Sequence, residues 1–260
     1  MKCYLINLDR SADRLQTMSK RFADIDISFI RIAGVDGKLL AQEEIDRFAG
    51  SDEMTPGTIG CLLSHRKCWQ AIVEGDEAFA AVFEDDVVLS SKATQFLRSD
   101  DWIPSDADIV KIESFNRVTR ITKKGLNSRN GFRLVRLMDD HLGAGGYILS
   151  KTTAKNLLEW TDGLKAAVDR AIFRPSNGIF SKLTIYQMTP ALCIQNQFCI
   201  RSNADSLIAY ERALKKAKRT KTQKLFRELG RPLEKAGKLL YRTWFNIFHD
   251  EKLTKIKFQK

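Results

Sequence analysis

The chain has 260 residues, of which 43% are hydrophobic and 29% charged, with 15 Gly and 5 Pro. Such a chain can bury a full core without disulfides or a structural metal, and its composition excludes a collagen-like or wholly disordered protein. The net charge of +11 belongs to one end of the chain. Residues 211–260 hold 16 Lys and Arg against 5 Asp and Glu, whereas the first 210 residues hold 27 of each. Arguments from charge about an anionic partner therefore apply to the C-terminal region alone.

The cysteine content and the lengths of the apolar runs indicate the cellular compartment that the sequence fits. Five Cys, an odd number at low density, do not predict a disulfide framework and fit a reducing cytosol. We find no apolar run of 18 residues and expect no transmembrane helix. The N-terminal sequence reaches Asp9 before any long apolar stretch, unlike a secretory signal peptide.

The first part of the chain predicts strands that alternate with helices. Ser11 is a candidate N-cap, and Pro56 after Thr55 favours the start of a long helix that Gly75 ends. This order predicts an α/β fold with a parallel sheet and crossover helices. The expected elements are strands at 3–8, 27–33 and 79–83 and helices at 12–23, 42–49 and 56–74.

The later part of the chain is more mixed, and we expect it to add antiparallel strands. Residues 116–131 are polar and punctuated by Gly, which predicts a hairpin or a mobile loop. From residue 205 onward, Leu and aromatic residues recur among Lys and Arg, so we expect a globular domain of residues 1–205 and a basic amphipathic helical region of residues 206–260. The other expected elements are strands at 108–113, 134–137 and 183–188, a segment at 143–149 that is Gly-rich and then apolar, and a helix at 152–160.

Three acidic residues, Glu84, Asp85 and Asp86, directly follow the apolar strand at 79–83. In open α/β sheets, ligands bind at the C-terminal ends of strands. Because side chains alternate along an extended chain, we expect Glu84 and Asp86 on one side and Asp85 on the other. Two carboxylates on one side can hold Mg²⁺ or Mn²⁺ together with a bound diphosphate. The alternative is a solvated acidic turn before the next helix.

A second polar motif, INLDRSADR, follows the first strand. Arg10 and Arg14 are four residues apart, so they share one face of the predicted helix. Paired arginines near a helix start suit phosphate or nucleotide recognition. The alternative is that both form surface ion pairs with Asp9 and Asp13, which contribute little to stability.

A third motif, TPGTIGCLLSHRKCW, places Cys61, His65 and Cys68 on one face of the predicted helix. A zinc site could be drawn there, but no fourth ligand is apparent, and structural zinc sites usually take Cys pairs from loops. We therefore favour a role as small buried hydrophobic residues for both Cys. Ser64 and His65 are candidates for hydrogen bonding to a ligand, with a satisfied core histidine as the alternative.

Two further motifs follow in the second half of the chain. Gly143, Gly145 and Gly146 allow the backbone to approach a sugar or phosphate closely, or they form a bend before a buried strand. The glycines precede a strand, so they are not a dinucleotide-binding fingerprint. Asp169 stands at the start of a possible short helix, where an Asp is often only an N-cap.

Taken in order, the motifs INLDRSADR, GCLLSH, FEDDV, GGYILS and VDR resemble those of glycosyltransferase family 25 over roughly residues 1–210. These are the bacterial lipooligosaccharide galactosyltransferases and relatives of the collagen galactosyltransferase domain. The resemblance implies a GT-A-like, Rossmann-type mixed sheet flanked by helices and a divalent metal cofactor, Mn²⁺ or Mg²⁺. It implies inverting transfer of a hexose, usually galactose from UDP-galactose, to a lipooligosaccharide or LPS core sugar. One departure is Leu62-Leu63, where the family often carries a Gly.

The resemblance also assigns roles to residues of this chain. We assign the metal to Asp86 first, with Glu84 and Asp85 contacting the ribose or metal-bound water, and we expect a further metal ligand from Gln195 or Gln197. For the base that takes the proton of the acceptor hydroxyl, Asp169 is the first candidate and Asp140 the second, and the sequence does not separate them. The implied donor-binding residues are Asn7, Leu8, Arg10, Arg14, Ser64, His65, Glu84, Asp85, Gly145 and Gly146.

The basic region predicts a partner of its own. Interleaved Leu and aromatic residues among many Lys and Arg fit an interfacial helix on an anionic membrane, here the inner face of the inner membrane. A solvated tail or an oligomerisation helix is the alternative. Nucleic-acid binding is disfavoured because the body is neutral and the tail offers no folded stacking platform. A binding-only pseudo-glycosyltransferase or a membrane-bound scaffold of glycolipid synthesis is the alternative function, and the oligomeric state is left open.

Overall fold

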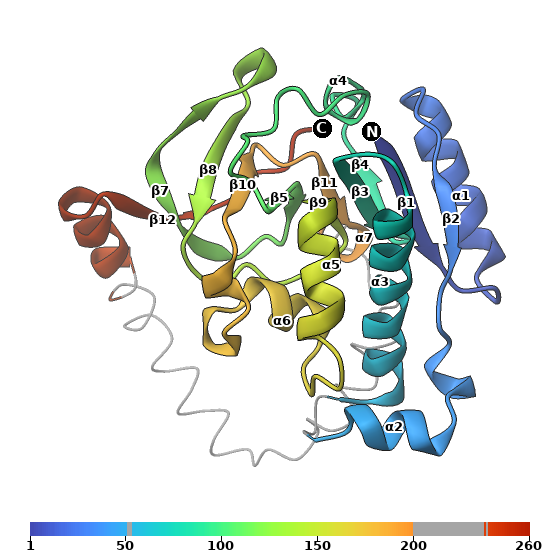
Figure 1. Cartoon of the computed structure of the whole chain (residues 1–260). Helices are drawn as coiled ribbons and strands as arrows, with labels where there is room; N and C mark the ends of the chain where they lie inside the picture. Colours follow the sequence, from blue (N-terminus) through green and yellow to red (C-terminus); the bar gives the residue numbers. More distant parts are fainter. Residues whose placement is uncertain (51–53, 200–236, 238) are drawn as a thin grey trace, which may run out of the picture.

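A nine-stranded mixed sheet forms the centre of the molecule, with strand order β12-β7-β8-β10-β5-β9-β3-β1-β2. The structure is a computed structural model that describes residues 1–50, 54–199, 237 and 239–260 (Figure 1). The strands of this sheet are β1 (Lys2–Asn7), β2 (Ile30–Ala33), β3 (Phe79–Glu84), β5 (Ile109–Lys111), β7 (Val118–Asn127), β8 (Arg133–Leu137), β9 (Gly146–Ser150), β10 (Ile185–Thr189) and β12 (Glu251–Lys255).

The predicted change from parallel to antiparallel pairing is confirmed. Strand β1 is parallel to both β2 and β3, as the alternation of strands and helices in the first part of the chain requires. Strand β9 is antiparallel to its neighbours β3 and β5, and β8 is antiparallel to β7 and β10. A small second sheet has the order β4-β11-β6. Its strands are β4 (Val87–Leu89), β11 (Cys193–Gln195) and β6 (Glu113–Ser114).

Helices cover both faces of the main sheet, which confirms the predicted α/β fold class (Figure 1). The alternation of side chains along β3 divides the core in two: Val82 packs with Trp69 and Leu157 on one face, while Phe83 packs with Phe22 on the other. The helices are α1 (Ala12–Asp24), α2 (Gln42–Phe48), α3 (Pro56–Glu74), α4 (Thr94–Leu97), α5 (Lys151–Trp160), α6 (Val168–Phe173) and α7 (Asn196–Cys199).

Helix α3 begins and ends where the sequence predicts. The Thr55 hydroxyl accepts a hydrogen bond from the Thr58 amide at 3.3 Å, Pro56 occupies the first turn, and Gly75 is the C-cap. The predicted N-cap position of α1 is confirmed, without a side-chain cap. Ser11 stands at the N-cap position, but its side chain makes no capping bond. Its backbone carbonyl instead accepts from the Asn7 side chain at 3.0 Å.

The C-terminal segment returns to the sheet. Segment 116–131 is a β-hairpin arm, because β7 pairs antiparallel with β8, and β12 then pairs antiparallel with β7. A helix over residues 239–248 precedes β12, and Phe245 and Ile256 are buried. Where the sequence predicts a continuous helical region, residues 251–255 are a strand that covers the edge β7 would otherwise leave unpaired. The predicted domain boundary at residues 205 and 206 lies outside the described residues.

The described helices include none that is both long enough and apolar enough to cross a bilayer.

Close packing at Gly60 gives a test of the fold. A Cβ at Gly60 would lie 2.5 Å from the Val35 carbonyl oxygen and 2.9 Å from the Gly37 amide nitrogen, both backbone atoms. We expect Gly60→Ala to lower the free energy of unfolding by about 1–3 kcal/mol through overpacking. Urea denaturation measures this, with Gly237→Ala as the matched control because a Cβ there meets nothing within 4 Å. Equal stability of the two variants would contradict the packing argument.

Candidate active site

The acidic motif lies at the C-terminal end of β3, where the chain turns into β4. Asp85 is held by two side chains that belong to the N-terminal motif: Arg14 Nη1 and Asn7 Nδ2 each lie 2.8 Å from one of its carboxylate oxygens. The Glu84 amide donates to the Gly145 carbonyl at 3.1 Å. The structure therefore brings together three of the five motifs that the sequence singles out.

Glu84 and Asp86 carry more negative charge than their surroundings neutralise. Burial raises the pKa of Glu84 to about 7, and the neighbouring carboxylates of Asp169 and Asp85 add to the effect. Burial also raises the pKa of Asp86 to about 7, with Glu84 as the main charged contributor. The Oδ1 atom of Asp86 is buried and has no hydrogen-bond partner in the part of the chain that the structure describes. An oxygen in this state is suited to accept a cation.

His65 is part of a hydrogen-bonded chain that ends at Glu84. Trp69 Nε1 donates to the Tyr147 hydroxyl at 2.9 Å, and that hydroxyl lies 2.9 Å from His65 Nδ1. His65 Nε2 lies 3.2 Å from Glu84 Oε1. His65 is fully buried, and burial lowers its pKa to about 3, so the ring is neutral. If Tyr147 donates to Nδ1, the proton of the neutral ring is on Nε2 and faces Glu84.

Two buried charged residues, Lys111 and Glu113, complete the cluster and were missed by the sequence reasoning. Lys111 Nζ lies 3.4 Å from Glu113 Oε2 and donates a hydrogen bond to the Gly143 carbonyl. It also lies over the Phe173 ring, 3.9 Å from the ring centroid, in a cation–π contact. Burial and the carboxylates of Glu84 and Asp86 raise the pKa of Glu113 to about 8. The sequence contains a pattern that could have identified them. Lys111 and Glu113 are charged residues two positions apart in an apolar stretch, so in an extended chain their side chains point to the same side.

The Gly-rich segment fits around this cluster. The Gly145 amide donates to Glu113 Oε2 at 3.0 Å, and a Cβ at Gly145 would lie 3.1 Å from Glu113 Oε1. Gly143 has φ +88, a left-handed conformation that favours glycine. Gly146 has another reason to be glycine, since a Cβ there would lie 2.2 Å from Cys193 Sγ. Gly146 is thus explained by packing within the protein.

The two candidate bases have different surroundings. Asp169 Oδ2 accepts a hydrogen bond from the Gly143 amide at 3.2 Å. The negative charge of Asp169 contributes an upward shift to the pKa of Glu84, His65 and Lys111. Asp169 Oδ1 accepts from the Arg170 amide in the first turn of α6. Asp140 Oδ2 lies 3.3 Å from Arg174 Nε, and the Asp140 side chain is 42% exposed. The structure therefore places Asp169 in the electrostatic field of the acidic motif and Asp140 in an ion pair.

The remaining predicted donor-binding residues are engaged within the fold. Arg10 pairs with Asp36, so the two arginines of the N-terminal motif have different carboxylate partners. The Ser64 hydroxyl donates to the Gly60 carbonyl at 2.6 Å and accepts from the Val35 amide at 2.8 Å. Half-buried Leu8 lies against Gly34. A donor-binding role of Leu8, Arg10 and Ser64 stays a prediction.

The oxygen atoms around Asp86 fit a hard divalent cation. Mg²⁺ and Mn²⁺ prefer carboxylate and amide oxygens, and Glu84 and Asp86 supply the carboxylates. Gln195 is buried on β11, next to β4, and the Asn196 amide donates to the Asp86 carbonyl at 2.8 Å. Gln195 Oε1 accepts from the Gln197 side chain at 2.7 Å, so its role as a metal ligand stays a prediction.

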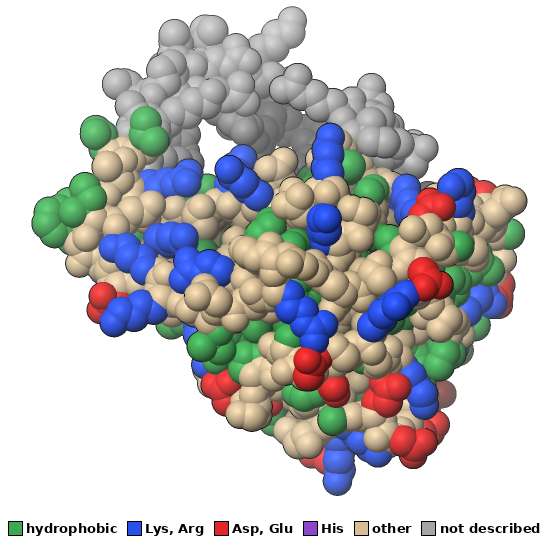
Figure 2. Space-filling model, turned by 90° about the horizontal axis from the view of Figure 1, so that it is seen from above, with side chains coloured by type: hydrophobic (Ala, Val, Ile, Leu, Met, Phe, Trp, Pro, Cys, Tyr) green, Lys and Arg blue, Asp and Glu red, His purple; other side chains and the backbone are tan. Residues whose placement is uncertain are grey.

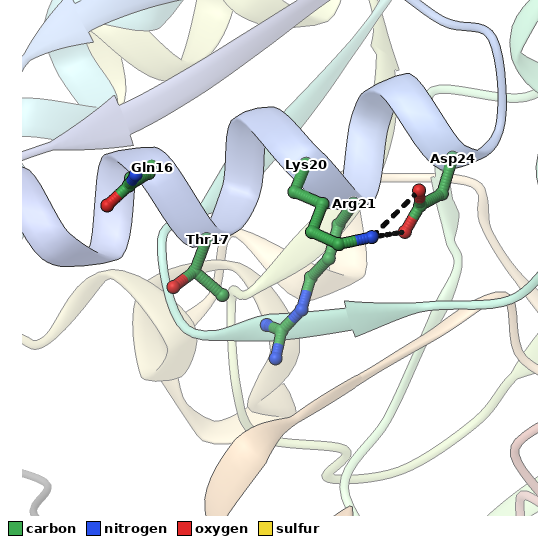
Figure 3. Close-up of a pocket in the computed structure, with 5 residues that line it drawn as sticks. All are labelled: Gln16, Thr17, Lys20, Arg21 and Asp24. Atoms are coloured by element: carbon green, nitrogen blue, oxygen red, sulfur yellow. Dashed lines mark hydrogen bonds and ion pairs between the residues drawn. The ribbon is translucent and has the colours of Figure 1, made fainter.

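A shallow hollow on the outer side of α1 contains none of the acidic motif residues. Figure 3 shows Lys20 reaching along the helix to Asp24, at 3.1 Å. Arg21, which also lines the hollow, donates to the Val87 carbonyl at 2.6 Å and to Asn196 Oδ1 at 3.1 Å. Arg21 therefore ties α1 to the two segments that follow the acidic turn and β11.

Comparison with known proteins agrees with the resemblance seen in the motifs. The profile of glycosyltransferase family 25 (LPS biosynthesis protein) matches residues 1–172. Lipooligosaccharide biosynthesis protein lic2B of Haemophilus influenzae is 27% identical over 204 residues, which cover 74% of this chain and 75% of that protein. Lacto-N-neotetraose biosynthesis glycosyltransferase LgtE of Neisseria meningitidis serogroup B is 31% identical over 218 residues, covering 75% and 74%.

Among solved structures, a glycosyltransferase involved in the glycosylation of the major capsid of PBCV-1 aligns with a TM-score of 0.43 at 8% identity. The alignment covers 75% of this chain and 91% of that chain. The family match spans the acidic motif, the helix that carries His65, the Gly-rich segment and Asp169. The chain therefore belongs to glycosyltransferase family 25.

Proposed function

We propose that this glycosyltransferase transfers a hexose, galactose from UDP-galactose, to a sugar of a lipooligosaccharide or LPS core acceptor. The relatives named above for lipooligosaccharide and lacto-N-neotetraose biosynthesis support the acceptor class. We further propose a GT-A-like arrangement, inversion at the anomeric carbon and a divalent cation. The donor sugar and the linkage follow from the family resemblance and not from a feature of the pocket.

The observation that carries the proposal is the excess of carboxylates at the end of β3. Burial raises the pKa of Glu84, Asp86 and Glu113, Glu84 further raises the pKa of Asp86, and both carboxylates further raise that of Glu113. Asp86 Oδ1 has no partner among the described residues. A nucleotide diphosphate is itself an anion, so it would be repelled from this cluster alone. A cation held by Asp86 would offset the negative charge and so remove that conflict.

Each residue around the acidic motif has a proposed role. Asp86 and Glu84 would hold Mn²⁺ or Mg²⁺, which when bound supplies positive charge to the leaving diphosphate. Arg14 and Asn7 fix Asp85, and through it the acidic turn, against α1 and β1. His65, as a neutral ring tied to Tyr147, holds Glu84 in one orientation.

We propose that Asp169 acts as the general base. Inversion requires the acceptor hydroxyl to attack opposite the leaving diphosphate and to lose its proton in that step. Asp169 lies in the electrostatic field of Glu84 at the start of α6, with one carboxylate oxygen fixed by the Gly143 amide. Its carboxylate would take the proton from the hydroxyl while the bond to the anomeric carbon forms.

Removal of the Asp86 carboxylate tests the cation site. We expect Asp86→Asn to weaken Mn²⁺ binding at least tenfold and to lower transfer by about 10²-fold or more, because the charge on the diphosphate is no longer matched. Since Mn²⁺ must displace protons from carboxyls whose pKa is about 7, its affinity should fall as the pH drops below 7. Calorimetric titration with Mn²⁺ at several pH values measures both effects.

The matched control for this test is Asp24→Asn, which removes a carboxylate from the surface of α1. It should leave Mn²⁺ affinity and transfer unchanged. If Asp86→Asn keeps near-native turnover of UDP-galactose with Mn²⁺ present, Asp86 does not hold the metal.

Substitution of each candidate base by Asn tests which of the two takes the proton. We expect Asp169→Asn to lower kcat by about 10²–10⁴-fold with little change in the KM of the donor, because only proton transfer in the transition state is lost. Asp140→Asn, which breaks the pair with Arg174, should lower kcat much less. Steady-state kinetics with a lipooligosaccharide core acceptor measures both variants. A loss below about tenfold in Asp169→Asn would remove it as the base.

We also propose that the C-terminal helix (residues 239–248) lies on an anionic membrane surface. Leu240, Trp244, Ile247 and Phe248 are 72%, 51%, 63% and 70% exposed at helical spacing, so they form one apolar face. Seen from above, hydrophobic side chains gather at the left edge of the molecule, with Lys and Arg side chains beside them (Figure 2). Lys and Arg near a membrane contribute about 1 kcal/mol each. A lipid-linked acceptor would be met at such a surface.

The apolar face can be tested without disturbing the core. We expect Trp244→Ser combined with Phe248→Ser to weaken sedimentation with vesicles of anionic lipid at least tenfold, since each large side chain contributes about 1.5–3 kcal/mol when buried. Leu39→Ser, at a residue that is 84% exposed on the 3-10 turn Gly37–Leu39, is the control. Equal sedimentation of the double variant and the control would refute membrane contact through this helix.

A further inference from the structure

Three potential metal ligands meet on the side of Glu84 that faces α3. Cys61 Sγ, a ring nitrogen of His65 and a carboxylate oxygen of Glu84 all lie within 4.8 Å of one another. Cys61 and His65 are one helical turn apart on α3, and Glu84 comes from the end of β3. The third ligand is thus supplied by the sheet. Cys68, which the spacing on the helix alone also allows, is fully buried in the apolar core and is not part of the group.

The second ring nitrogen of His65 is already oriented by the protein. Nδ1 lies 2.9 Å from the Tyr147 hydroxyl, which in turn accepts from Trp69 Nε1, so Nε2 is directed at Glu84. Nε2 can bind a metal in the tautomer whose proton is on Nδ1 and is donated to the Tyr147 hydroxyl, and metal-bound histidines usually donate their other ring N–H in this way. His65 is fully buried, whereas Cys61 is half-buried and the Glu84 side chain is 25% exposed. An ion can therefore approach from the side of Cys61 and Glu84.

The chemistry of this donor set differs from that of the acidic turn. Sulfur, nitrogen and one carboxylate oxygen are the ligands that Zn²⁺ takes, and three protein ligands leave a fourth position for water. Mn²⁺ and Mg²⁺ prefer oxygen ligands alone. The nearby carboxylate of Asp169, which acts on both His65 and Glu84, adds negative charge that favours a dication.

We propose that Cys61, His65 and Glu84 form a site for Zn²⁺, in which the Cys61 thiol releases its proton to solvent and binds as the thiolate. Zn²⁺ binding does not depend on the transferase reaction. One consequence does rest on the proposed function: Glu84 belongs to both donor sets, so Zn²⁺ at this site removes a carboxylate from the cation site at Asp86 and opposes transfer.

Co²⁺ serves as a spectroscopic probe for the site, since it accepts the same ligands and a thiolate bound to it gives a charge-transfer absorption. We expect the full chain to show this absorption and to lose it when Zn²⁺ is added. In Cys61→Ser the absorption should be absent and Zn²⁺ affinity at least tenfold weaker. Cys199→Ser, which removes an exposed thiol outside the group, is the matched control and should behave as the unchanged chain.

A second measurement uses the unchanged chain and so does not depend on the folding of a variant. Zn²⁺ should slow alkylation of Cys61 by iodoacetamide at least tenfold, as followed by mass spectrometry, and leave the rate at Cys199 unchanged. Absorption that persists in Cys61→Ser, no absorption in the unchanged chain, or equal alkylation of Cys61 with and without Zn²⁺ would each overturn the proposal. None of these readouts uses sugar transfer, so failure here is distinguishable from failure of the proposed function.

Discussion

An excess of carboxylates at the C-terminal end of β3 is the constraint around which the rest of the site is arranged. Glu84, Asp85, Asp86 and Glu113 stand close together where water is largely excluded, and Arg14 and Lys111 offset only part of their charge. The unfavourable balance appears as raised pKa values and as an unpartnered oxygen on Asp86. A protein that only needed to fold would gain stability from apolar residues here. The proposed function accounts for this cost, because a cation held by these carboxylates would offset their charge.

Helix α3 sets the position of this cluster from the opposite side. Its contact with the sheet includes Trp69 on α3 and Tyr147 on β9, both fully buried. The Trp69 indole donates a hydrogen bond to the Tyr147 hydroxyl, which is also hydrogen-bonded to His65. This arrangement satisfies three polar groups inside an apolar layer and at the same time orients His65 toward Glu84. The same side chains thus belong to the core and to the site, so packing changes in this layer are transmitted to the acidic turn.

Glu84 occupies a position between two different sets of potential ligands. On one side lie the oxygens of the acidic turn, and on the other lie Cys61 and His65. Hard cations favour the first set and borderline-soft cations the second. The choice of cation would then determine whether Glu84 faces the proposed donor site or α3.

The sequence by itself determined the order of strands and helices, the ends of α3 and the acidic motif, because these depend on local periodicity and capping. It also determined the family, since the five motifs occur in a fixed order. The tertiary structure decided which residues meet. Arg14 was separated from Arg10, and Lys111 and Glu113 joined the cluster, because sheet pairing brings together segments distant in sequence. Strand β12 formed because the edge of β7 was available, a property of the sheet that no local pattern in residues 251–255 contains.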